Sequence, residues 1–544
     1  MLTAAAGRAL RLSPPVTGRV IARRGLAVRT RDGVILRTDH YAPALDGAPT
    51  VLVRTPYGRG GVTGLAARLL AERGFHVVMQ SCRGTTGSGG TFEPMRHERA
   101  DGLDTVDWLR RQPWFTGVLG MFGPSYVGYT QWAIADVPEL AAMATVVTAS
   151  SFRDPVYAGD SFSLFTTLAW ANLLAAQTQP WLSSTVEVLR GSPRLNRAFA
   201  HLPLGEADQL ATGAEVSFFR EWLALADENT PERTRYWTDQ DHSHRLPGLT
   251  AEVLMVGGWY DIFLPWQLAD YAALRAAGAR PHLTIGPWTH GGGGLLAASV
   301  RESVDWLRAQ LRGERDGLRS KPVRLYVTGA DQWREYEDWP PPADETRRWY
   351  LGPGGALTPD PRPSTVDHFW YDPADPTPTV GGPLLLSNVS GPKDNRGVEA
   401  RPDVLVYTSS IMDRQVDVVG PVTATVHVRA SQPYHDLFVR LCDVDPSGRS
   451  VNLCDALARI RPGTRPTGPG GTTVVEVELW PTAHRFRAGH RIRLQVSGGS
   501  HPRYPRNLGT GARLDRSTDL LPVEVEVWHD PDRPSYVSLP IVYR

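Results

Sequence analysis

The sequence VLGMFGPSYVGYTQW, residues 118–132, joins an apolar run to a helical pattern through a turn of small residues around Ser125. Val118 to Phe122 is predicted to be a buried strand, and a helix is predicted from the turn through Asp136. A serine on such a turn presents its hydroxyl at the carboxyl edge of a sheet, where a helix N-terminus stabilises negative charge. Ser125 is therefore a candidate nucleophile, although glycine-flanked serines also occur in ordinary turns.

The sequence around this segment alternates between short apolar runs and helical stretches. The apolar runs lie at 51–53, 75–79, 118–122, 143–147, 253–256 and 282–285. Continuous apolar strands separated by helices predict a parallel sheet covered on both faces, so we expect an α/β core. The strand-like runs disappear over 150–245, where aromatic, leucine-rich helical stretches replace them. We therefore expect a core formed by residues 1–149 and 246–345, with a helical cap inserted over 150–245.

The remaining residues, 346–544, have a different pattern. They are rich in proline and glycine, and apolar residues alternate with polar ones at 422–428, 475–479, 492–496 and 523–527. This alternation predicts half-buried antiparallel strands, as in a sandwich or jelly roll. The chain has 544 residues, which is too long for one hydrophobic core, and several domains agree with that length.

Two residues downstream of Ser125 complete a candidate catalytic triad. Asp261 follows the predicted strand at 253–256, and His290 follows the predicted strand at 282–285. A serine nucleophile needs a base that an acid holds in place, and in α/β-hydrolases these residues follow in the order serine, acid, histidine. Each residue also has an ordinary explanation, since Asp261 is suited to cap a helix and His290 is one of 15 histidines. Their order and placement favour the triad.

An oxyanion hole and an apolar pocket are expected beside the triad. The amide of Tyr126, which follows the nucleophile, should supply one donor, and the loop at 54–58 should supply a second. Within that loop Tyr57 follows a proline, so its hydroxyl is a candidate donor, although the ring is equally explained as a structural aromatic. Four further aromatic residues are candidates for lining the pocket, although each is equally suited to a core: Trp170, Trp259, Phe263 and Trp288.

Composition excludes several other classes of function. The net charge of +1 gives no reason to expect nucleic acid as a partner, and no apolar run is long enough to span a membrane. Arginines interrupt the N-terminal apolar residues, so no signal peptide is expected. The three cysteines match no disulfide framework or zinc pattern, which favours buried free thiols and a cytoplasmic location. Four acidic residues lie at near-helical spacing: Glu98, Asp101, Asp104 and Asp107. A solvated helix face or ion pairs with nearby arginines explain this stripe better than a metal site does.

Eight segments together resemble the cocaine-esterase and Xaa-Pro dipeptidyl-peptidase hydrolases. They are RTPYG at 54–58, SCRGTTGSGG at 81–90, DGLDTVDWLRRQPW at 101–114, GMFGPSYVGYTQW at 120–132, GGWYDIF at 257–263, GPWTHG at 286–291, YDPADPTPTVGG at 371–382 and LWPTAHRFRAGHRIRLQVSGGSHPRYPRN at 479–507. The resemblance spans nearly the whole chain. It implies an α/β-hydrolase core with an inserted helical cap, followed by a C-terminal jelly roll.

The resemblance also implies roles for individual residues. The nucleophile falls on Ser125, the acid on Asp261, the base on His290 and the oxyanion tyrosine on Tyr57. The family's turn reads G-x-S-Y-x-G, which this chain matches. Ser81 departs from the acidic residue usual in relatives, and this puts a structural ion pair in doubt rather than the chemistry.

The sequence thus predicts a cofactor-independent serine hydrolase that cleaves a carboxylic ester, or less readily an amide, of a small, largely apolar or aromatic substrate. A homodimer is a further expectation. Relatives that act on α-amino esters carry acidic residues just after the catalytic acid, whereas apolar residues follow here at 262–264. A dipeptidyl-peptidase stays an alternative if Asp154, Asp160 or Glu187 binds the amino terminus of the substrate. An acyltransferase with the same triad is a second alternative, and a non-catalytic binding module is a third.

Overall fold

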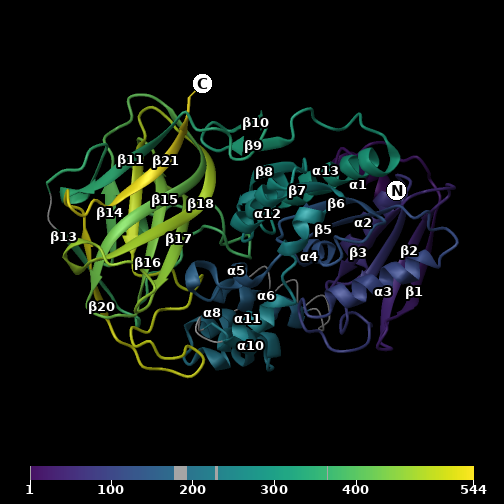
Figure 1. Cartoon of the computed structure of the whole chain (residues 1–544), viewed down its shortest axis with the longest axis horizontal. Helices are drawn as coiled ribbons and strands as arrows, with labels where there is room; N and C mark the ends of the chain where they lie inside the picture. The colour runs from purple at the N-terminus through teal and green to yellow at the C-terminus, as the bar shows by residue number, and fades with distance from the viewer. Residues whose placement is uncertain (1, 177–192, 227–230, 364–365, 544) are drawn as a thin grey trace.

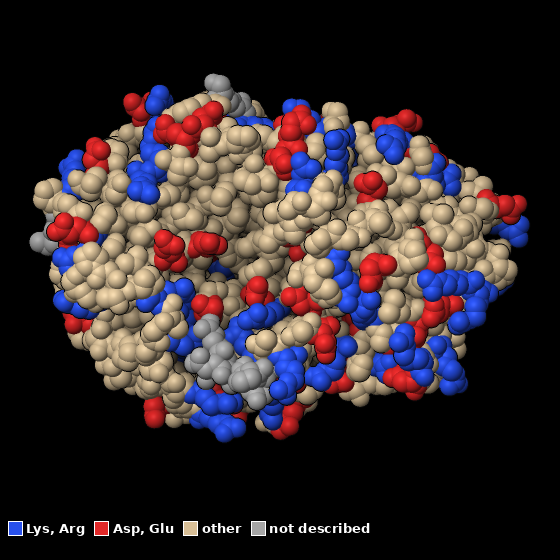
Figure 2. Space-filling view, viewed as in Figure 1, with Lys and Arg blue, Asp and Glu red and all other residues tan. Residues whose placement is uncertain are grey.

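The protein has an α/β core at one end, a β domain at the other and a group of helices between them, as the computed structural model shows (Figure 1). The structure describes residues 2–176, 193–226, 231–363 and 366–543. Figure 2 shows basic and acidic side chains interspersed over one face, which is hollowed between the two ends of the molecule. No helix in these described ranges is long and apolar enough to cross a membrane.

The core contains one sheet of ten strands in the order β1-β2-β4-β3-β5-β6-β7-β8-β9-β10. The strands are β1 (Val20–Arg29), β2 (Ile35–Pro43), β3 (Thr50–Thr55), β4 (His76–Ser81), β5 (Leu119–Pro124), β6 (Leu140–Val146), β7 (Glu252–Tyr260), β8 (His282–Thr289), β9 (Val323–Val327) and β10 (Gln332–Tyr336). Strands from β4 through β9 run parallel, and the pairs at the two edges are antiparallel.

Helices cover both faces of this sheet, as the continuous apolar strands predict. The helices of the core are α2 (Gly61–Ala71), α3 (Glu98–Arg110), α4 (Tyr126–Trp132), α12 (Leu264–Ala276) and α13 (Gly293–Arg312). Val51 and Val53 pack into the apolar cluster that includes α2 and α13, while Leu52 between them packs into the cluster of α3, α4 and α12. Successive side chains of a strand point to opposite faces, so both faces need apolar residues.

The sheet is mixed, whereas the sequence predicts a parallel one. The edge strands β1 and β10 were not predicted because they lack the apolar pattern of the central strands. Most side chains of β1 are exposed, and β10 reads QWREY with no buried residue. An edge strand that faces solvent needs no apolar run, since only part of its surface meets the core.

The cap consists of short helices between β6 and β7. They are α5 (Arg153–Val156), α6 (Leu164–Ala176), α8 (Pro193–Ala200), α9 (Ala207–Thr212), α10 (Ser217–Ala224) and α11 (Pro231–Thr238). Their buried aromatic residues form one apolar cluster with Tyr126 and Phe263 of the core. The cap therefore packs directly over the carboxyl edge of the sheet near Ser125.

The C-terminal domain is an almost entirely antiparallel sheet of eleven strands. The strands are β11 (Glu345–Gly352), β12 (Ala356–Thr358), β13 (Val366–Tyr371), β14 (Val404–Thr408), β15 (Val416–Ala430), β16 (His435–Val444), β17 (Ser450–Ile460), β18 (Thr473–Phe486), β19 (Arg491–Ser497), β20 (Val523–Trp528) and β21 (Tyr536–Val542). The alternation in β20, whose residues are in turn buried and half-buried, matches the period-two pattern of the sequence.

Close contacts join the β domain to the other two parts. The ring of Trp266 on α12 meets that of Trp480 on β18 edge-on, with 5.6 Å between centroids. In the cap, Gly159 lies so near the backbone of Leu457 on β17 that any side chain there would collide with the Leu457 carbonyl oxygen. The three parts therefore meet around one region of the molecule.

The remaining structural predictions concern cysteines and acidic residues. All three cysteines are buried free thiols, as predicted. The acidic stripe on α3 pairs with arginines, also as predicted: Glu98 with Arg54, Asp101 with Arg83, Asp104 with Arg31 and Asp107 with Arg110. Within the described ranges, no group of three or more His, Cys, Asp or Glu side chains could hold a metal ion.

Candidate active site

Ser125 lies on a strained turn between β5 and α4. Its backbone angles are φ 57° and ψ −125°, a conformation that non-glycine residues seldom adopt. Gly128 is required on the next turn, because a Cβ there would overlap the side chain of Thr148. That threonine in turn donates a hydrogen bond from its hydroxyl to the Ser125 carbonyl at 2.8 Å. The small residue at 128 thus allows the neighbouring loop to hold the turn.

The structure brings Ser125, His290 and Asp261 together in a chain of hydrogen bonds. The Nε2 atom of His290 is 3.1 Å from the Ser125 hydroxyl, and its Nδ1 atom is 2.7 Å from the Asp261 carboxylate. The Asp261 side chain is fully buried, and the His290 side chain is 10% exposed. With Nδ1 protonated, Nε2 faces the serine hydroxyl as an acceptor, which is the arrangement that activates a serine.

Asp261 does not cap α12, whose N-cap is Phe263 and has no side-chain capping hydrogen bond. Its Oδ1 atom accepts a hydrogen bond from the Phe263 amide at 2.8 Å, just before α12, while Oδ2 faces His290. The contact with the Phe263 amide belongs to the turn before the helix. The amide fixes the carboxylate, and the carboxylate then fixes the imidazole.

Two hydrogen-bond donors lie beside the nucleophile. Tyr126 is the first residue of α4, so its amide has no partner within the helix. The Tyr57 hydroxyl hydrogen bonds with the Ser125 side chain and accepts the indole N–H of Trp170 at 3.1 Å. Burial raises the pKa of Tyr57 to about 12, against the opposing effect of these two hydrogen bonds, so the hydroxyl keeps its proton at neutral pH.

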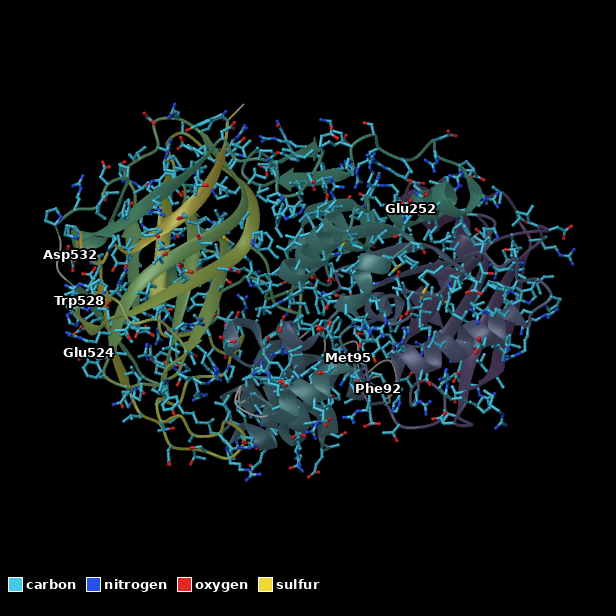
Figure 3. All side chains as sticks on the ribbon, viewed as in Figure 1. Phe92, Met95, Glu252, Glu524, Trp528 and Asp532 are labelled. Atoms are coloured by element: carbon cyan, nitrogen blue, oxygen red, sulfur yellow. The ribbon has the colours of Figure 1, made fainter. Side chains whose placement is uncertain are left out.

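A buried network holds Tyr126 from behind. Its hydroxyl donates to Glu98 at 2.9 Å and accepts the Met95 amide at 2.8 Å. Glu98 forms an ion pair with Arg54, whose side chain is wholly buried, at 2.9 Å. Met95 and the nearby Phe92 lie where the core faces the cap (Figure 3). The sequence shows the acidic stripe but gives no sign that one of its members supports the residue after the nucleophile.

A largely apolar pocket opens onto Ser125 and has walls from all three parts of the protein. The core contributes Tyr57, Met95, Tyr126, Ile262, Phe263 and Trp266; the cap contributes Phe152, Pro155, Val156, Ala158, Ser163, Thr166, Thr167, Trp170 and Trp222; the C-terminal region contributes Pro383, Leu385, Trp480, Arg503 and Tyr504. This mixture of aromatic walls and few polar groups is typical of sites for small organic molecules.

Two of the four predicted pocket aromatics line this pocket, and two do not. Trp170 and Phe263 are part of its wall. Trp259 is instead buried in the core, where its indole N–H donates to the Tyr326 carbonyl at 2.7 Å. Trp288 packs against Trp333, with 5.6 Å between the ring centroids. Nearness in sequence to Asp261 and His290 is therefore not enough to place a side chain in the pocket.

The C-terminal wall of the pocket was missed at the sequence level. Trp480, Arg503 and Tyr504 lie more than 180 residues beyond His290 in the chain. Their segment, 479–507, resembles that of relatives, but nothing local in it indicates contact with Ser125. Only the packing of the β domain against the core and cap brings them there.

The acidic residues considered as anchors for a substrate amino group do not line the pocket. Asp160 instead pairs with Arg465 at 3.2 Å, and the Asp154 side chain is 63% exposed next to Arg153. Glu187 lies outside the described residues. Within the described part of the chain, no carboxylate is found on the pocket wall.

Ser81 stands where the resemblance described above leads us to expect an acidic residue. Its hydroxyl accepts a hydrogen bond from the guanidinium of Arg59, which also pairs with Asp39 at 3.2 Å. Arg59 therefore has an acidic partner although Ser81 is not one.

Comparison with known proteins divides the chain into two matching regions. Residues 32–292 match the X-Pro dipeptidyl-peptidase (S15) family, and residues 317–538 match the X-Pro dipeptidyl-peptidase C-terminal non-catalytic domain. The cocaine esterase of Rhodococcus sp. strain MB1 Bresler is 32% identical, over 97% of this chain and 100% of its own.

Two solved structures share the fold over almost their whole length. An aminopeptidase from a marine sediment Thaumarchaeota archaeon has a TM-score of 0.80 at 23% identity, covering 96% of both chains. An α-amino acid ester hydrolase has a TM-score of 0.80 at 21% identity, covering 98% of both chains. At these identities the likeness concerns the fold alone.

Proposed function

Because the chain belongs to the CocE/NonD and X-Pro dipeptidyl-peptidase (S15) family of serine hydrolases, we propose that it cleaves carboxylic esters of small, largely apolar or aromatic substrates. The observation that carries this proposal is the Ser125–His290–Asp261 chain of hydrogen bonds at an aromatic pocket whose described wall holds no carboxylate. A small ester fits such a wall better than a peptide with a charged amino terminus does.

In the first half of the reaction, Ser125 attacks the carbonyl carbon of the ester. Nε2 of His290 accepts the hydroxyl proton as the bond from Oγ to the carbonyl carbon forms, and Asp261 stabilises the resulting imidazolium. The negative charge on the carbonyl oxygen is met by the Tyr57 hydroxyl and the Tyr126 amide. Collapse of this intermediate breaks the ester bond, and His290 gives its proton to the departing alcohol.

In the second half, water takes the place of the alcohol. His290 removes a proton from the water as it attacks the acyl group on Ser125, and the same two donors again stabilise the oxyanion. When the bond from carbon to Oγ breaks, the proton returns from His290 to the serine. The acid product leaves, and no cofactor is used in either half.

Two alternatives share this triad. A dipeptidyl-peptidase needs an anion for the substrate's amino terminus, and the pocket wall described above offers a cation instead. An acyltransferase would pass the acyl group to another alcohol or amine in place of water. The triad is common to all three, so substrates must separate them.

The test is a panel of p-nitrophenyl esters and Xaa-Pro anilides, applied to the wild type and to Ser125→Ala. We expect ester hydrolysis that the substitution abolishes, with no anilide cleavage by either protein. Labelling of Ser125 by a fluorophosphonate gives an independent report on the nucleophile. Ester hydrolysis at the wild-type rate in Ser125→Ala would show that the site lies elsewhere, and faster cleavage of the anilides would favour the peptidase.

A further inference from the structure

One side chain on the described wall of the pocket carries a full charge, and it is a cation. Arg503 follows β19 and reaches the pocket beside Trp480 and Tyr504. Its side chain is only 5% exposed. A buried charge beside a substrate pocket is costly unless something compensates it, so its partners decide what it can do.

Arg503 belongs to a buried cluster of two cations and one anion. Asp455 on β17 hydrogen bonds with the Arg503 guanidinium through Oδ1 and with Arg440 on β16 through Oδ2, the latter at 2.9 Å. The side chains of Arg440 and Asp455 are 2% and 0% exposed. Arg440 also donates to the Val380 carbonyl and to Asn395, so it has partners enough without the pocket.

The charges of this cluster do not cancel. Arg440 alone neutralises Asp455, so Arg503 leaves a net charge of +1 in a buried position. Burial lowers the pKa of Arg503, but Tyr504 and Asp455 outweigh this effect and hold it above its ordinary value, so the guanidinium stays charged.

Arg503 also has hydrogen-bonding capacity to spare. Its Nη2 atom is buried and has no partner of good hydrogen-bond geometry among the described residues, although the guanidinium also interacts with the Tyr504 hydroxyl. The guanidinium lies over the rings of Trp480 and Tyr504, at 4.8 and 4.9 Å from their centroids, and both rings line the pocket. These rings hold the cation in the pocket wall but accept no strong hydrogen bond from Nη2.

We propose that Arg503 binds a carboxylate on the substrate, so that the preferred esters carry one negative charge at a distance from the ester bond. This inference rests on the proposed function and specifies its substrates. A single carboxylate matches the net charge of the cluster, and its two oxygens suit the fork of a guanidinium. The aromatic walls then contact the carbon chain or ring between carboxylate and ester. Arg503 is thus a specificity-determining residue rather than a catalytic one.

The carboxylate can belong either to the acid or to the alcohol of the ester, and two pairs of substrates distinguish these sources. For the acid side, p-nitrophenyl hydrogen glutarate is compared with p-nitrophenyl pentanoate, which has the same chain length. For the alcohol side, 4-acetoxybenzoate is compared with phenyl acetate. The measured quantity is the ratio of kcat/KM for the charged ester to kcat/KM for its neutral partner.

The ratio is measured in the wild type, Arg503→Met and Arg503→Lys. Loss of a hydrogen-bonded ion pair with the substrate should lower the ratio by about 10- to 100-fold in the methionine variant, in one of the two pairs. The lysine variant keeps the charge and should keep part of the preference. Arg503→Met leaves Asp455 paired with Arg440, so the cluster becomes neutral and the fold should tolerate the change.

Three outcomes would overturn the inference. The wild type could prefer the neutral ester in both pairs, a result that needs no variant. The ratio of kcat/KM for the charged ester to that for the neutral ester could stay at its wild-type value in Arg503→Met. It could also fall as far in Arg503→Lys as in Arg503→Met. Turnover of the neutral esters shows that each Arg503 variant is folded. Loss of neutral-ester turnover in Ser125→Ala shows that the proposed function holds even where the carboxylate preference fails. If Arg503→Met does not fold, Arg503→Gln takes its place.

Discussion

Replacement of Tyr57 by phenylalanine removes a single oxygen from the candidate oxyanion hole. In the wild type this hydroxyl accepts the indole N–H of Trp170 at 3.1 Å, which orients it, and it also hydrogen bonds with the Ser125 side chain. The developing oxyanion therefore meets a donor that is already oriented. Tyr57→Phe keeps the ring and its packing but leaves the Tyr126 amide as the remaining donor.

The expected loss follows from this count of donors. Removing one of two donors in an oxyanion hole costs about 10²- to 10³-fold in kcat, or about 2.7–4 kcal/mol. The neutral carbonyl of the bound ester gains less from the hydroxyl than the oxyanion does, so KM should change little. Because the pKa of Tyr57 is raised to about 12, its ionisation should not limit the wild-type rate up to about pH 10.

Steady-state hydrolysis of one neutral p-nitrophenyl ester measures the effect, with Trp170→Phe as the matched control. That variant leaves the Tyr57 hydroxyl in place and removes the bond that orients it, together with part of the pocket wall, so kcat should fall by less than about tenfold. A kcat for Tyr57→Phe within about threefold of the wild type would refute a role for this hydroxyl in binding the oxyanion. An equal loss in both variants would indicate that the pair acts only through packing.

Two further predictions concern buried carboxylates. In Asp261→Asn the Phe263 amide should keep its hydrogen bond with the side-chain oxygen, so the new NH₂ group faces His290 and selects the wrong tautomer of the imidazole. We expect kcat to fall by about 10⁴-fold while the protein stays folded. A loss in kcat below about tenfold would contradict this. Asp270 accepts two hydrogen bonds from Ser150, and burial raises its pKa to about 7 against their effect. The folded state therefore binds a proton more tightly than the unfolded state, and stability should fall by about 4 kcal/mol as pH rises from about 4 to 8. Asp270→Asn mimics the protonated acid, so its Tm should exceed that of the wild type at pH 8 and approach it near pH 5; a difference that does not vary with pH would be inconsistent with this shift.

The triad could be predicted from sequence because each member follows a strand that is recognisable by itself. The apolar runs before Ser125, Asp261 and His290 are continuous, and parallel strands bring their carboxyl ends to one edge of the sheet. The packing of the helices follows from the same runs. Local sequence and elementary topology therefore suffice for the reacting groups, although their exact distances depend on the complete fold.

The pocket wall could not be predicted in the same way. Whether Trp259 or Trp266 faces the site depends on which side of its element meets the cap and the β domain, and both are equally apolar in sequence. Arg503 is one of many arginines, and its importance comes from the charge balance with Asp455 and Arg440. Contacts between distant segments determine these features, and a single sequence contains no periodic signal for them.

The meeting of three parts at one pocket has a consequence for how this protein can change. The proposed catalytic groups come from residues 57–290, while Trp480, Arg503 and Tyr504 belong to the β domain, which contributes none of them. Under the proposed function, substitutions in the β domain should therefore alter which esters are accepted and leave the bond-breaking step intact. New substrate preferences are open to natural variation on one side of the pocket, at little risk to the reaction itself.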